Sequence, residues 1–84
     1  MFYGFLIYMQ EQIFDFTGLK CPLPVLKARR ALKSIDIGQT ITVMADDPAA
    51  PLDFKHFCET AGHQLEHQSD LNGLFTFIIR KLSL

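Results

Sequence analysis

The sequence is short of cysteine and of net charge, and each shortage excludes a class of protein. Two cysteines in 84 residues are too few for a secreted fold held together by disulfides. Eight basic and nine acidic residues give a formal net charge of −1, which argues against a protein held on nucleic acid mainly by charge. No apolar run approaches the ~20 residues that span a bilayer. We therefore expect a cytoplasmic globular protein that binds neither a membrane nor nucleic acid directly.

Apolar residues, in contrast, are plentiful. They make up 49 % of the chain and include eight phenylalanines, which excludes a disordered chain. The length suits one small domain, and we predict that domain over residues 11–82. Residues 1–10 are almost wholly apolar and lack the basic region and the cleavage site of a signal peptide. We expect them to be an extension outside the domain, either disordered or upstream of a true start at Met9; the alternative is that they lengthen the first strand.

Alternating and helical hydrophobic patterns divide the domain into six elements. Alternation predicts four strands, at residues 13–16, 40–45, 63–68 and 74–81. Helical spacing predicts two helices, at residues 22–35 and 50–61. Asp70-Leu71-Asn72-Gly73 favours a hairpin turn between the last two strands. Each element has one apolar face, so the order βαβαββ predicts an α/β (α+β) two-layer sandwich, with two helices on one face of a four-stranded mixed sheet.

Cys21 is the residue that we expect to carry the chemistry, because it stands at the start of a predicted helix. The positive end of that helix, with Lys20 and Lys27 nearby, would stabilise a thiolate and lower the pKa of the thiol. Pro22 and Pro24 stiffen the turn and hold the sulfur atom at the surface. These surroundings favour a nucleophile over the small buried residue that a lone cysteine more often is.

The sequence places no catalytic partner beside Cys21. His56, His63 and His67 lie far along the chain, whereas a Cys–His enzyme needs an adjacent base. There is no Cys-x-x-Cys motif to supply a resolving thiol. His63 and His67 are expected on one strand face with Leu65, but without metal-ligand spacing, so we expect no metal and no other cofactor. The chemistry that remains is to accept a group and pass it on, which is typical of a carrier.

Three further residues receive structural interpretations. Cys58 lies on the apolar stripe of the second helix, and we expect a packed core thiol rather than a resolving cysteine. Asp46 and Asp47 are expected to form a turn and cap the following helix, rather than to act as paired carboxylates.

Basic residues are concentrated in one stretch of an otherwise balanced chain. Five of the eight lie between positions 20 and 33, namely Lys20, Lys27, Arg29, Arg30 and Lys33. Such a run is either a solvated helix face or a site for an anion or an acidic partner. Leu23 and Leu26 fall away from the apolar stripe of the helix, beside Lys27 and Arg30. We predict that these four residues form a docking patch, unless the sheet or the N-terminal segment covers them.

Four blocks of the sequence match one family in register from Ile13 to Lys81. They are Gly18-Leu19-Lys20-Cys21-Pro22-Leu23-Pro24-Val25-Leu26-Lys27, Ala45-Asp46-Asp47-Pro48-Ala49, Phe57-Cys58 with Gly62-His63, and Ile79-Arg80-Lys81. With them the chain resembles the TusA/SirA/YedF family of small sulfur carriers, whose fold is the two-layer α/β sandwich. The resemblance implies a motif that supports Cys21, made of Gly18, Lys20, Pro22, Pro24, Asp47 and Pro48.

The same resemblance implies a function. Cys21 would receive sulfur as a transient persulfide from a cysteine desulfurase and hand it to a downstream acceptor protein, as in tRNA thiolation or molybdenum-cofactor sulfur supply. The chain would then be a sulfurtransferase subunit with little turnover of its own. Two alternatives stay open: a protein- or RNA-binding regulatory module in which Cys21 is incidental, and a thiol redox regulator that uses Cys21 and Cys58.

Overall fold

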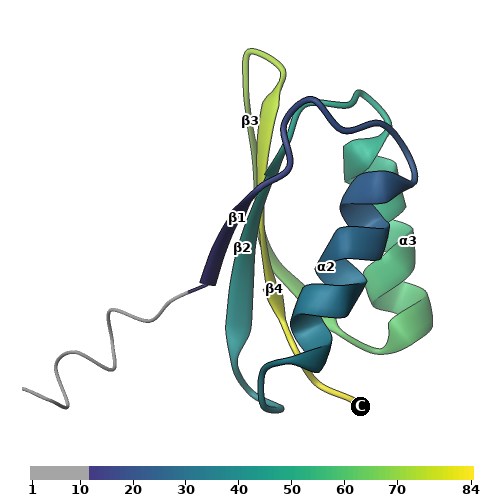
Figure 1. The fold of residues 1–84 in the computed structure, drawn as a ribbon, viewed down its shortest axis with the longest axis vertical. Helices are drawn as coiled ribbons and strands as arrows, with labels where there is room; N and C mark the ends of the chain where they lie inside the picture. Colours follow the sequence, from purple (N-terminus) through teal and green to yellow (C-terminus); the bar gives the residue numbers. More distant parts are fainter. Residues whose placement is uncertain (1–11) are drawn as a thin grey trace, which may run out of the picture.

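The computed structural model describes residues 12–84, so the extension predicted at residues 1–10 lies outside the described residues. Six elements follow one another: β1 (Gln12–Asp15), α2 (Leu23–Lys33), β2 (Thr40–Ala45), α3 (Ala50–Ala61), β3 (Gln64–Leu71) and β4 (Leu74–Arg80). The strands form one sheet in the order β1-β2-β4-β3, in which only the β1–β2 pair is parallel. Both helices lie on one face of this sheet (Figure 1). The predicted βαβαββ two-layer sandwich with a mixed sheet is therefore confirmed.

The core lies between the sheet and the two helices. Alternate residues of the central strands β2 and β4 point into it, as the sequence pattern predicts. Its fully buried larger side chains are Phe54, Phe77, Leu32, Ile41, Ile79 and Val43. Phe54 of α3 stacks on Phe77 of β4, with ring centroids 4.6 Å apart. This contact fixes α3 against the middle of the sheet.

Helix α2 is shorter at both ends than the pattern predicts. It begins at Leu23, with Pro22 as its N-cap residue, and it ends at Lys33, with Ser34 as its C-cap. Pro24 is buried in the first turn, where a missing N–H group breaks no helical hydrogen bond. With 11 and 12 residues in α2 and α3, no helix within residues 12–84 is long and apolar enough to cross a membrane.

Strand β3 contains an irregularity that the sequence pattern does not reveal. Leu65 pairs with Ile79, but His67 pairs with the neighbouring Ile78, so the register shifts between them. Because adjacent residues of β4 point to opposite faces of the sheet, Leu65 and His67 do so as well. The prediction that His67 shares a face with Leu65 is therefore wrong. Glu66, at the shift, forms an ion pair with Arg80 of β4.

Candidate functional site

The site predicted around Cys21 lies where two loops meet. Strands β1 and β2 are parallel, so the chain leaves both at the same edge of the sheet, towards α2 and α3 respectively. The two loops run side by side at the top of the molecule (Figure 1). Cys21 is exposed near the end of the first loop, one residue before the N-cap of α2. The topology therefore presents its sulfur atom at one end of the molecule.

Two aspartates of the second loop hold the first loop in place. An oxygen of Asp46 accepts a hydrogen bond from the backbone N–H of Gly18 at 2.9 Å. Asp47 Oδ2 accepts one from the N–H of Cys21 at 2.6 Å, and its Oδ1 accepts one from the N–H of Ala49 at 3.2 Å. These bonds lower the pKa of Asp47, the bond from Cys21 first, and the charge of Lys20 adds to the effect.

The predicted helix-capping role of these aspartates is wrong. Helix α3 has Ala49 as its N-cap residue and no side-chain cap. Asp47 does form the predicted turn, since its Oδ1 accepts from the N–H of Ala49. Both carboxylates also reach back across 28 and 26 residues to the cysteine loop. Gly18, which donates one of these bonds, has a φ of +85°, a conformation that other residues rarely adopt. Asp46 and Asp47 therefore position the backbone on which Cys21 stands.

The thiol of Cys21 also meets a carboxylate. A hydrogen bond to Asp53 of α3 raises the pKa of Cys21 above its ordinary value, and partial burial and the charges of Asp53 and Asp47 act in the same direction. This is the reverse of the lowered pKa that the sequence predicts. Lys20 is exposed and its charge acts on Asp47 instead. The empty site therefore favours a neutral thiol.

The start of α2 provides few free backbone N–H groups that could stabilise a thiolate at Cys21. Anions bind at helix starts because the first backbone N–H groups are unpaired. Here Pro22 and Pro24 have no N–H group, and Leu23 donates its own to the carbonyl of Lys20 at 2.8 Å. The residues that stiffen the cysteine turn thus also remove donors that would stabilise a thiolate.

A pocket of about 260 Å³ opens beside the sulfur atom. One side is formed by Cys21, Pro22 and Val25, and the other by residues of α3, which are Asp53, His56, Phe57 and Thr60. Sequence reasoning missed Asp53 and His56, which follow Cys21 by more than 30 positions. Their spacing of three places them on one side of α3, but only the packing of α3 beside α2 shows that this side meets Cys21.

The predicted docking patch is a groove between α2 and β1. Leu23 and Leu26 are 44 % and 47 % exposed, so the sheet does not cover them, and Lys27 and Arg30 are exposed beside them. The four residues line one hollow of about 770 Å³, whose floor includes Phe14 and Phe16. The alternative that the N-terminal segment covers the patch falls outside the described residues. Pro48, the last motif residue, lies exposed in the second loop.

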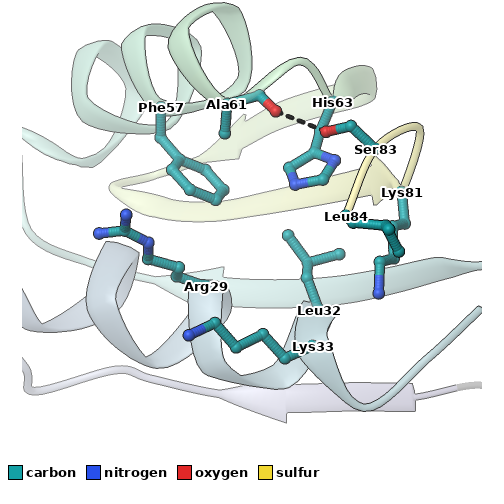
Figure 2. A pocket seen from close by; sticks show the side chains of 9 residues that line it. All are labelled: Arg29, Leu32, Lys33, Phe57, Ala61, His63, Lys81, Ser83 and Leu84. Atoms are coloured by element: carbon teal, nitrogen blue, oxygen red, sulfur yellow. Dashed lines mark hydrogen bonds between the residues drawn. The ribbon is translucent and has the colours of Figure 1, made fainter. Parts of the chain in front are cut away.

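A second cavity lies at the other end of α2. Its volume is about 430 Å³, and Figure 2 shows Arg29 and Lys33 of α2 on one side and Phe57, Ala61 and His63 on the other. The buried Lys81 donates through Nζ to the carbonyl of Ile35 at 2.7 Å, just past the end of α2. Burial, and then the charge of Lys81, lower the pKa of His63. These basic groups complement the partial negative charge at the end of α2.

Cys58 is in the core, as predicted. Its side chain is 3 % exposed, and burial, with a smaller contribution from Glu59, raises the pKa of its thiol to about 11. Among residues 12–84 no group of three His, Cys, Asp or Glu side chains lies close enough to hold a metal ion. Cys21 is therefore the cysteine that a partner protein can reach.

Comparisons with known proteins agree on one family. The family model described as "Sulfurtransferase TusA" matches residues 12–81. Putative sulfur carrier proteins of Neisseria meningitidis serogroups A and B are 44 % identical to this chain over 72 residues, which cover 86 % of it and 97 % of each relative. The sulfur carrier protein TusA of Allochromatium vinosum is 38 % identical over 71 residues, which cover 84 % of this chain and 93 % of that protein. The crystal structure of a SirA-like protein from Desulfitobacterium hafniense superposes with a TM-score of 0.73, at 27 % identity, over 86 % of this chain and all of that one.

Proposed function

Because this chain belongs to the TusA sulfurtransferase family and is similar to sulfur carriers, we propose that it relays sulfur as a persulfide on Cys21. A cysteine desulfurase is the donor and a second protein is the acceptor. The observation that carries the proposal is the exposed Cys21, whose backbone N–H is held at 2.6 Å by Asp47. A sulfur atom that must meet two successive partners needs this combination of exposure and fixed position.

The chemistry is two thiol exchanges in sequence. In the first, the Cys21 sulfur attacks the outer sulfur of the donor's persulfide, so that a new S–S bond forms and the donor leaves as a thiolate. In the second, a thiol of the acceptor attacks the outer sulfur on Cys21, and Cys21 is the leaving group. Neither step needs an oxidant or a metal. The chain thus acts as a sulfurtransferase subunit with little turnover of its own.

Partner recognition fits the groove between α2 and β1, whose lining on α2 begins at Leu23, two residues after Cys21. Leu23 and Leu26 supply exposed apolar surface, and Lys27 and Arg30 supply positive charge. This combination favours a partner surface that is apolar at its centre and acidic at its rim. We place the relay in the cytoplasm, where thiols stay reduced, with tRNA thiolation or molybdenum-cofactor sulfur supply as its destination.

The test is to load the protein with sulfur. We expect incubation with a cysteine desulfurase and cysteine to add the mass of one sulfur atom, about 32 Da, to the intact protein. Cys21→Ser should abolish the adduct and Cys58→Ser should retain it, since Cys58 is buried. Absence of an adduct on the wild type would favour a binding module, and its loss in both variants would favour a redox regulator. Either result contradicts the proposal.

A further inference from the structure

The cavity at the end of α2 gathers positive charge. Its volume is about 430 Å³, and its lining includes Arg29, Lys33 and Lys81. None of the residues 12–84 that line it is acidic. The ion pair that the structure records within these residues lies elsewhere, between Arg80 and Glu66. The three cations of the cavity therefore have no carboxylate partner in the described part of the chain.

Lys81 is the clearest case, because it is buried. It is 6 % exposed, and lysine is rarely buried to this extent unless its charge is paired. Its Nζ donates to the carbonyl of Ile35 at 2.7 Å, which uses one of the three N–H groups of an ammonium. The end of α2 contributes only about half a negative elementary charge. An anion bound in the cavity would balance what remains.

His63 adds a neutral hydrogen-bond donor to the cavity. Its Nδ1 accepts a hydrogen bond from the backbone N–H of Leu82 at 3.2 Å. A neutral imidazole that accepts at one nitrogen carries its proton on the other. Burial, and then the charge of Lys81, lower the pKa of His63 and so favour this neutral ring. The donor that His63 keeps for a ligand is therefore Nε2–H.

The rest of the lining is largely apolar. Leu32 of α2 lies on one side, and Phe57 and Ala61 of α3 lie on the other (Figure 2). The volume falls within the range of small-molecule sites, about 300–1,000 Å³. An inorganic ion would fill little of this space and would leave the apolar wall in water. A ligand with a charged head and an apolar body would use both parts of the lining.

We propose that this cavity binds a small organic anion, whose charged head meets the basic lining and whose apolar body packs on Leu32 and Phe57. The head is a carboxylate or a phosphate monoester, since guanidinium and ammonium groups bind both. Cys21 does not line the cavity, so the ligand is not a reactant at the sulfur. Arg29 and Lys33 also line the groove between α2 and β1, and a bound anion therefore lowers the positive charge of that groove as well.

The experiment titrates the full chain with benzoate and with phenyl phosphate at constant ionic strength, and follows the backbone amides by NMR. We expect saturable shifts around Leu32, Phe57 and His63, with a Kd of about 1 mM or below for the better probe. The better probe identifies the head group. Inorganic phosphate lacks the apolar body and benzyl alcohol lacks the charge, so each should bind roughly tenfold more weakly or not at all.

Two double variants test the basic lining. Arg29→Gln/Lys33→Gln removes two charges from the cavity, whereas Lys27→Gln/Arg30→Gln removes two charges from the same helix outside it. All four side chains are exposed, so both variants should fold, which their NMR spectra check. The first should weaken binding of the better probe roughly five- to tenfold, and the control should stay within about twofold of the parent protein.

Three results would overturn the proposal: shifts that do not saturate, inorganic phosphate binding as tightly as the organic anions, or equal weakening in both double variants. The second of these would mean an adventitious ion only. The titration needs neither a sulfur donor nor a reactive Cys21. Its outcome is therefore independent of whether the protein loads sulfur.

Discussion

At the scale of single residues, the two cysteines are both held as thiols, for different reasons. Cys21 is exposed, and the pKa of its thiol is raised, first by hydrogen bonding to Asp53. Cys58 is buried among apolar side chains, where a charged sulfur has no solvation. The first thiol is open to a partner protein, whereas the second is covered by the folded core.

The buried thiol of Cys58 should make the free energy of unfolding depend on pH in the alkaline range. Its pKa is about 11 in the folded protein against an ordinary 9.0, so above pH 9 the unfolded thiol loses its proton first. The free energy of unfolding should therefore fall between pH 9 and pH 11, by at most roughly 2–3 kcal/mol from this group. Urea unfolding of Cys21→Ser and of Cys21→Ser/Cys58→Ala across this range measures it. Equal pH slopes in the two proteins would show that the Cys58 thiol does not contribute.

The sequence identifies half of the candidate site. Cys21 and its prolines are adjacent in the chain, so their geometry follows from local rules. Asp47 is found only through the family resemblance, because its bond to Cys21 joins residues 26 positions apart. Asp53 has no local signal, since its role depends on which side of α3 faces α2. The predicted direction of the pKa shift of Cys21 was wrong for the same reason. Lys20 and Lys27 are close to Cys21 in the sequence, whereas Asp53 comes near it only through the packing of α3 beside α2.

At the scale of elements, α3 serves both the core and the site. Phe54, Phe57 and Cys58 on one side are buried, while Asp53 and His56 on another line the pocket beside Cys21. Phe57 belongs to both, because it also borders that pocket. The packing that stabilises the domain thereby also sets the distance between carboxylate and sulfur.

Phe54 is the residue of α3 whose loss should cost most. It is fully buried and stacks on Phe77, so Phe54→Ala should lower the free energy of unfolding by about 3–5 kcal/mol. Leu52, two residues earlier, is 72 % exposed, and Leu52→Ala should change it by less than about 0.5 kcal/mol. Urea unfolding of both variants makes the comparison. Similar losses for the two would mean that α3 does not pack on the sheet through Phe54.

The extent of β3 also shows where sequence reasoning stops. Strands β2 and β4 alternate regularly and were predicted to within a residue. Strand β3 is polar and mostly exposed, so its pattern gives neither its true end at Leu71 nor the register shift after Leu65. Pairing continues to the end because Asn72 and Gly73 both adopt positive φ, 55° and 88°, which suits a two-residue hairpin turn.

At the scale of the whole molecule, a nearly neutral protein presents one basic face. The positive side chains of α2 border the groove between α2 and β1, and none of the residues 12–84 that line it is acidic. Charge of one sign around an exposed reactive atom speeds the encounter with an oppositely charged partner. Association with an acidic partner therefore depends on where the charged side chains lie, and less on the net charge of the protein.

Reversing charge in the groove should therefore weaken partner binding. We expect Lys27→Glu/Arg30→Glu to slow association with a cysteine desulfurase roughly tenfold or more at low salt, with less difference at high salt. Lys55→Glu reverses a charge outside the groove and is the control, so it should leave the association rate close to that of the parent protein. Surface plasmon resonance gives the rates. An association rate unaffected by the change at Lys27 and Arg30 would remove these residues from the docking surface.

The strand order has a consequence for how the protein comes to be folded. Strand β4 is the last of the four in the sequence, yet it lies between β2 and β3 and contributes Phe77 and Ile79 to the core. Until it emerges from the ribosome, β3 has no neighbour to pair with and Phe54 has no ring to stack on. Apolar residues of the nascent chain therefore stay exposed to solvent or bound to a chaperone until β4 has been synthesised. Folding of the sheet, and with it the fixed position of Cys21, therefore waits for β4.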